Sequence, residues 1–149
     1  MKATIKLIFD FIAATLSCFV LASLLHTQFV LHELIKLDVI ISWQTRLSAS
    51  GKDLLGLLPT YGAIILVGLF IAFVCVFLIN KVWPKPILWL YPIAGAVALF
   101  TMLTAMQPIM DITLIAGART PLGIFAQCLA GLFGGWVFMY QRQRRPSKL

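Results

Sequence analysis

Four long apolar runs constrain what this chain can fold into. They cover residues 7–25, 59–79, 87–106 and 122–140. Each run has about 20 residues, the length at which an α-helix crosses the ~30 Å hydrocarbon core of a bilayer. The chain is 61% hydrophobic and 11% charged, whereas a soluble domain carries about 25% charged residues. The 149 residues therefore predict one all-α membrane domain, a four-transmembrane-helix bundle without a separate soluble domain.

The basic residues are divided unequally between the two sides of such a bundle. If both termini lie on one side, eight of the 12 Lys and Arg residues lie there, including those of the tail 141–149. Because cytoplasmic segments carry an excess of Lys and Arg, we expect a multi-pass protein of the plasma membrane, the inner membrane in a bacterium, with both termini cytoplasmic. We expect the basic tail to meet anionic lipid headgroups rather than nucleic acid.

The two outer segments, 26–58 and 107–121, each contain a stretch in which apolar and polar residues alternate, with Ile40 as the main exception. Alternation of this kind is typical of a strand with one buried face. We therefore expect a short β-sheet that pairs the two segments as a cap over the bundle. The alternative is a tilted interfacial helix over 28–47. The residues on the apolar face are Ile35, Leu37, Val39, Ile41 and Trp43 in the first segment and Met110, Ile112, Leu114 and Ala116 in the second.

The first outer segment also contains the stretch HELIK, which differs by one residue from the HExxH signature of zinc proteases. That signature needs histidines four residues apart on one helix face, with the glutamate as base. Here Lys36 replaces the second histidine, and its cation repels a metal. We therefore expect no metal or other cofactor, and polar residues that lie at the outer water interface. The alternative is a metal-dependent membrane enzyme whose site uses His26, His32 and Glu33 with Asp38 or Asp111.

Few polar side chains lie inside the apolar runs. Asp10 is the one acid among them, one helical turn after Lys6, and we expect these two residues to form a pair near the membrane boundary. A buried acid of this kind is otherwise a candidate for coupling transport to protons or ions. We expect Gln127 to form a hydrogen bond between helices. In the second outer segment, we expect Asp111 and Arg119 to form a salt bridge across a turn.

The last apolar run has a repeated pattern of small residues. Ala126, Ala130 and Gly134 recur every four residues, and Gly131 and Gly135 form a GxxxG beside them. Small residues on one helix face let another backbone approach closely. We expect this face to pack within the chain, with contact between copies as the alternative. Weaker versions of the pattern are Gly68 with Ala72 and Ala94 with Ala98.

These patterns predict a class of function rather than a reaction. The leading hypothesis is a non-enzymatic accessory, scaffold or assembly subunit that acts through helix–helix and outer-cap contacts. Its partners would be the lipid bilayer and either another membrane protein or further copies of itself in a homo-oligomer. The alternative is a small oligomeric transporter or channel that uses Asp10 as its coupling acid.

Overall fold

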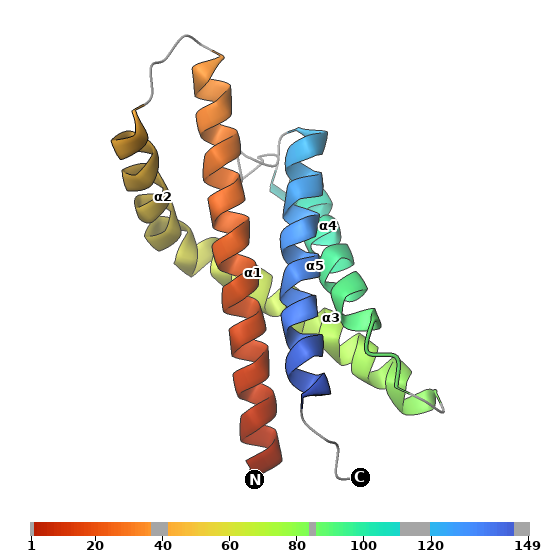
Figure 1. The fold of residues 1–149 in the computed structure, drawn as a ribbon. Coiled ribbons are helices and arrows are strands. Elements are labelled where there is room, and N and C mark those ends of the chain that lie inside the picture. The colour runs from red at the N-terminus through yellow and green to blue at the C-terminus, as the bar shows by residue number, and fades with distance from the viewer. Residues whose placement is uncertain (1, 37–41, 84–85, 111–119, 145–149) are drawn as a thin grey trace.

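All secondary-structure elements in the described part of the computed structural model are helices. It comprises residues 2–36, 42–83, 86–110 and 120–144, and for residues 2–3, 33 and 107–110 it describes the backbone only. α2, a π-helical turn η1 and α3 follow one another without a break, so the described chain forms four helical rods (Figure 1). The elements are α1 (Lys2–Ile35), α2 (Trp43–Leu57), η1 (Leu58–Gly62), α3 (Ala63–Val82), α4 (Leu90–Met110) and α5 (Pro121–Gln143).

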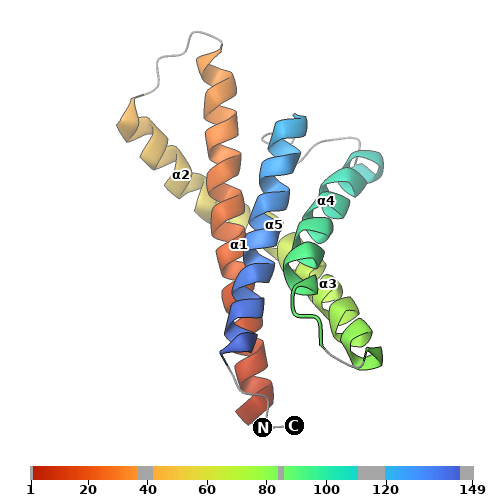
Figure 2. The ribbon, with the colours of Figure 1, turned by 45° about the vertical axis from the view of Figure 1, so that its right-hand side comes forward.

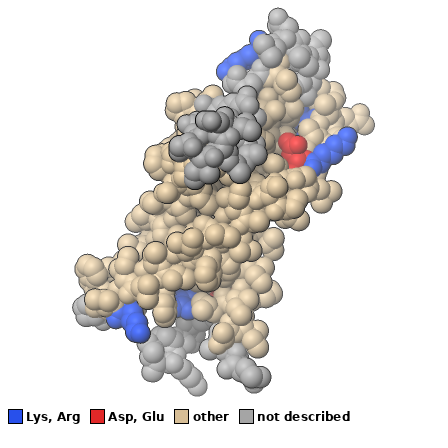
Figure 3. Space-filling view, turned by 180° about the vertical axis from the view of Figure 1, so that it is seen from behind, with Lys and Arg blue, Asp and Glu red and all other residues tan. Residues whose placement is uncertain are grey.

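Three of these rods are long and apolar enough to cross a membrane, namely Thr4–His32, Trp43–Val82 and Pro121–Gln143. Leu90–Met106 of α4 is a shorter apolar helix. On the face shown in Figure 3, charged side chains lie towards the two ends of the molecule and the middle is uncharged. The structure therefore agrees with the prediction of a helical membrane protein.

α5 lies between α1 and α4 and contacts both of them along its length. The continuous rod of α2, η1 and α3 crosses this layer obliquely (Figures 1 and 2). The first turns of α1 and the last turns of α5 lie at the same end of the molecule, here called the termini end. The opposite end, where α1 ends and α2 begins, is called the hairpin end.

The predicted β-sheet cap is wrong for the residues that the structure describes. Ile35 belongs to α1, Trp43 begins α2, and Met110 ends α4. α1 stays helical beyond residue 26 because its buried face continues at helical spacing through His26, Thr27 and Leu31. The lipid-facing apolar residues of α1 hide this periodicity in the sequence. The remaining predicted strand positions lie in 37–41 and 111–119, outside the described residues.

The single tilted helix over 28–47, the alternative to the sheet, is also not found. Its first part is the end of α1, and its last part is the start of α2. α2 begins after Ser42, whose side-chain oxygen accepts a hydrogen bond from the backbone N–H of Thr45 at 3.3 Å. A capping serine of this kind satisfies one of the free N–H groups of a first helical turn. It gives α2 a start of its own.

Glycines allow α5 to lie against both neighbouring helices at backbone distance. A Cβ atom on Gly131 would lie 2.8 Å from the carbonyl carbon of Gly95 in α4, and one on Gly134 would lie 2.6 Å from the Cβ of Cys18 in α1. Gly135 meets the backbone of Tyr91 in the same way. Since dispersion and close packing, rather than water exclusion, hold helices together in lipid, these approaches stabilise the three-helix layer.

The π-helical turn η1 changes the direction of the long rod. Pro59 has no N–H and its ring crowds the preceding turn, so a regular α-helix cannot continue through it. The wider turn carries Tyr61 into the interior, where its side chain is 2% exposed. This turn positions the hydroxyl of Tyr61 for a hydrogen bond to α5.

Candidate functional site

The hairpin half of the bundle contains a buried hydrogen-bonded link between three helical rods. The Tyr61 hydroxyl donates to Oε1 of Gln127 at 2.9 Å, and Nε2 of Gln127 donates to the carbonyl oxygen of Ala22 at 3.0 Å. Gln127 and Ala22 are both 0% exposed. The amide of Gln127 thus joins η1, α5 and α1, which is a helix-to-helix hydrogen bond of the kind expected for this residue.

A second polar group lies one to two turns further along α1, where α2 packs against it. The Thr27 hydroxyl lies 2.9 Å from Oδ2 of Asp53 and 3.0 Å from the carbonyl oxygen of Ser23, so it can donate to either. His26 is buried and lies within electrostatic reach of Asp53. The Ser23 hydroxyl is fully buried and makes no hydrogen bond within the described residues. These contacts hold α2 against α1.

The described residues of HELIK are exposed, as expected for a polar boundary, whereas His26, six residues earlier than His32, is not. His26 is buried in the contact between α1 and α2, whereas His32 is exposed two turns later. The side chain of Glu33 and all of Asp38 and Asp111 lie outside the description. Within the described part of the chain, no three His, Cys, Asp or Glu side chains come together as a set that could hold a metal.

Asp10 lies deeper in the protein than its place near the start of the chain suggests. Its side chain is 1% exposed, whereas Lys6 one turn earlier is exposed. Arg119, the expected partner of Asp111, lies outside the described residues, so their salt bridge stays a prediction. Asp10, His26 and Gln127 are thus the described candidates that the structure places in the interior.

The small residues of the last span occupy two faces of α5. Gly131 and Gly135 lie against α4, and Gly134 lies against α1. Ala126 and Ala130 are buried on the same helix. The described contacts of these glycines are therefore with helices of the same chain.

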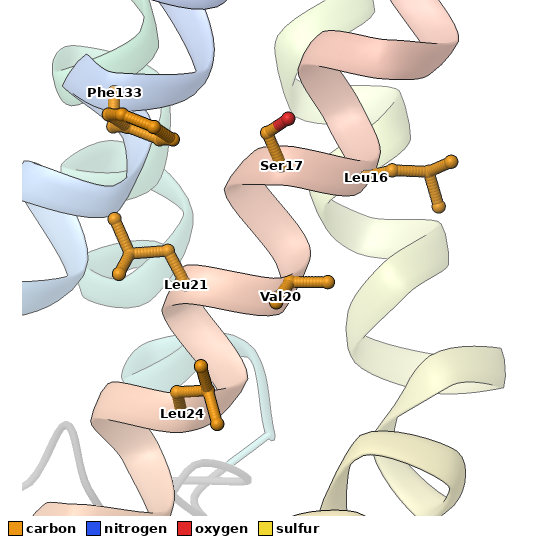
Figure 4. Close-up of a pocket in the computed structure, with 6 residues that line it drawn as sticks. All are labelled: Leu16, Ser17, Val20, Leu21, Leu24 and Phe133. Carbon is orange, nitrogen blue, oxygen red and sulfur yellow. The ribbon is translucent and has the colours of Figure 1, made fainter.

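The surface between α1 and α5 has a shallow apolar cavity of ≈ 420 Å³ (Figure 4). Leu21 of α1 and Phe133 of α5 lie on its two sides, and Ser17 is the one polar residue among those that line it. The Ser17 hydroxyl donates to the carbonyl oxygen of Ala13 at 2.7 Å. Since its polar group is satisfied within its own helix, this surface suits lipid chains rather than a polar ligand.

Apart from Gln127, the sequence did not single out the residues that join the rods in the hairpin half. Asp53 reaches Thr27 because the long rod folds back along α1. Tyr61 reaches Gln127 because the same rod then crosses α5. The sequence feature that could have identified Tyr61 is its position two residues after Pro59 in an apolar run. No spacing in the sequence relates Asp53 to Thr27, which lies 26 residues earlier.

Comparison of the chain with protein-family models, with curated proteins and with solved structures gave no match. Function is therefore inferred from the residues of this chain. The contacts of Thr27 with Asp53 and of Gln127 with Tyr61 and Ala22 join helices, and an apolar groove lies between α3 and α4.

Proposed function

We propose that this protein is a non-enzymatic accessory or scaffold subunit, a multi-pass protein of the plasma membrane with both termini cytoplasmic, which holds a transmembrane helix of another membrane protein. The observation that carries this proposal is an apolar groove between α3 and α4. The end of α3 and the start of α4 lie close together, and the two helices diverge from there (Figures 1 and 2). The groove has a volume of ≈ 440 Å³.

The charges of the described residues support the proposed orientation. The ends of α1, α3 and α5 that point towards the termini end (Figure 1) carry Lys6, Lys81, Arg142 and Arg144. The end of α1 and the helix α2, at the hairpin end, carry Lys36, Arg46, Lys52 and Asp53. The termini end thus has the larger number of described cations. Because positive residues are retained on the cytoplasmic side during insertion, this distribution favours cytoplasmic termini.

Small residues lie along both walls of the groove, Gly68 and Ala72 on α3 and Ala94 and Ala98 on α4. Each pair has the spacing of four residues that puts both members on one helix face. Within the chain, faces of this kind let α4, α5 and α1 approach at backbone distance. An apolar helix of a partner would gain the same close packing in the groove, which a flexible acyl chain would not.

A native cysteine offers a direct test of this groove. Cys75 lines it and is exposed, while Cys18 is buried inside the bundle. With Cys18 and Cys128 replaced by alanine, a benzophenone maleimide on Cys75 should photo-crosslink to one defined membrane protein in native membranes. Ala94→Leu should reduce that adduct about 5- to 100-fold, because overpacking by such a side chain costs about 1–3 kcal/mol.

The matched control moves the same probe to the other side of α3. Phe77 is 54% exposed and does not line the groove, so the probe on Phe77→Cys in a Cys75→Ala background should react mainly with lipid. The same protein adduct from both positions, or lipid adducts alone from Cys75, would contradict a helix-binding groove.

Transport is the second candidate function, and the burial of Asp10 favours it. An acid inside a membrane-spanning helix is costly and often marks an ion or proton pathway. Asp10 is 1% exposed within the candidate span Thr4–His32. We expect the accessory role to hold, so vesicles with the wild-type protein and with Asp10→Asn should show the same proton leak under an imposed potential. A wild-type proton flux that Asp10→Asn abolishes would replace the accessory role with transport.

A further inference from the structure

A cavity of ≈ 290 Å³ with polar side chains in its wall lies between α1 and α2 at the hairpin end. Gln28, Phe29 and His32 of α1 and Arg46 of α2 line it. Among the described lining residues, the side chain contributed by α2 is the guanidinium of Arg46, a planar group with fixed geometry. The cavity belongs neither to the buried links described above nor to the groove between α3 and α4.

The charge of Arg46 is held in place by neutral groups. Its guanidinium donates to Oε1 of Gln28 at 3.4 Å, and its Cζ lies 5.6 Å from the centre of the Trp43 ring. Within the described residues no carboxylate forms an ion pair with it. An amide oxygen and an aromatic face orient a cation without neutralising it, so Arg46 is prepared to bind an anion.

The level of the cavity along α1 indicates which anion is available there. The 22 residues from Lys6 to Gln28 rise about 33 Å, close to the ~30 Å thickness of a hydrocarbon core. With Lys6 at one boundary, Gln28 and Arg46 lie at the headgroup level of the opposite leaflet. Trp43, which is 85% exposed beside Arg46, has the amphipathic ring that prefers this level.

We propose that this cavity binds the phosphodiester group of a phospholipid in the leaflet opposite the termini. Two N–H groups of Arg46 would donate to two phosphate oxygens, the geometry that guanidinium and phosphate share. The Nε2 group of Gln28 and the imidazole of His32 supply further donors on the wall formed by α1. Phe29 lies where the glycerol and the first methylene groups of the lipid would pack. The inference depends on α1 crossing the membrane and not on a partner helix.

The test uses the delipidated full chain in detergent micelles with added phosphatidylglycerol, and native mass spectrometry counts the lipids that stay bound. Arg46→Gln should weaken binding of one lipid about 10- to 100-fold, the effect of removing a charged hydrogen-bond partner. Arg46→Lys keeps the charge but loses the two-pronged geometry, so its affinity for the lipid should fall between those of the wild type and Arg46→Gln. Lys52→Gln is the matched control, since Lys52 is an exposed cation of α2 outside the described lining of the cavity.

Two results would overturn the inference. If Arg46→Gln and Lys52→Gln retain the lipid equally well, Arg46 is not its ligand. Inorganic phosphate provides the second comparison: if it protects the protein against heat as well as phosphatidylglycerol at the same concentration, the ligand is a soluble anion rather than a phospholipid. Protection by phosphatidylglycerol alone, lost in Arg46→Gln, supports the site.

Discussion

Replacing Gly131 with alanine should lower the free energy of unfolding by about 1–3 kcal/mol, the usual cost of adding a methyl group to a filled interior. The new Cβ would lie 2.8 Å from the carbonyl carbon of Gly95 and 3.2 Å from the backbone nitrogen of Ala96. These are backbone atoms of a packed helix, so no side-chain rotation can relieve the contact. α4 and α5 must separate instead, and the loss is measured as a lower Tm and a lower free energy of unfolding in detergent micelles.

Gly56→Ala is the matched control for this experiment. Gly56 is also a helical glycine, but a Cβ placed on it would have no atom within 4 Å. Alanine should therefore stabilise α2 by about 0.5–1 kcal/mol, because it restricts the unfolded chain and favours the helix. If Gly131→Ala is as stable as the wild type, α4 and α5 do not approach at backbone distance, and the layer of α1, α5 and α4 would need a different packing.

Replacing Gln127 with leucine should lower the free energy of unfolding by about 1–3 kcal/mol through a different cause, the loss of hydrogen bonds to buried groups. Leucine has nearly the volume of glutamine, so packing changes little. The Tyr61 hydroxyl donates to Gln127 at 2.9 Å and would lose this acceptor, although the Tyr61 side chain is only 2% exposed. The Ala22 carbonyl would lose its donor from Gln127. The measurement is again the free energy of unfolding in detergent micelles.

Tyr61→Phe completes a double-mutant cycle that isolates the bond between the two side chains. Hydrogen bonds between membrane helices contribute about 0.6 kcal/mol on average and up to about 1.7, so the coupling energy should fall in this range. Thr101→Val serves as control, because the exposed Thr101 hydroxyl donates to Val97 of its own helix. A coupling energy of zero would mean that Tyr61 and Gln127 do not bond, and that η1 is held against α5 by packing alone.

Together these two predictions distinguish how α5 is held on its two sides. Gly131 and Gly135 hold it against α4 by shape, whereas on the side of α1 and η1 the close approach of Gly134 is joined by the hydrogen bonds of Gln127. Both devices leave the groove between α3 and α4 untouched. Variants in the groove can therefore be interpreted as binding variants, provided that their unfolding in micelles matches that of the wild type.

Several features of the fold could be predicted from the sequence because they depend on local properties of the chain. The length and apolarity of the four runs predict membrane-crossing helices, and three of the rods meet that criterion. The departure from a regular α-helix at Pro59 follows from the chemistry of proline. The spacing of Ala126, Ala130 and Gly134 predicts a helix face that another helix can approach closely. In the structure these three residues are buried on α5.

The outer segment shows why other features could not be predicted. Residues 35–43 alternate between apolar and polar as a strand would, yet Ile35 ends one helix and Trp43 begins another. Residues 26–35 are helical because they continue the buried face of α1, which includes His26 and Thr27. Both residues are polar, so a hydrophobicity pattern predicts them to be exposed. Their burial depends on Asp53, which reaches Thr27 only after the chain has turned back.

By itself, the sequence determined that the chain has helices long and apolar enough to cross a membrane, because helix length and hydrophobicity are properties of each segment alone. Only the tertiary structure decided which side chains form the interior. In a bilayer the surroundings are as apolar as the core, so the outward and inward faces of a helix look alike in composition. The link through Gln127, the groove between α3 and α4 and the setting of Arg46 exist because particular helices cross at particular places, and no single segment specifies them.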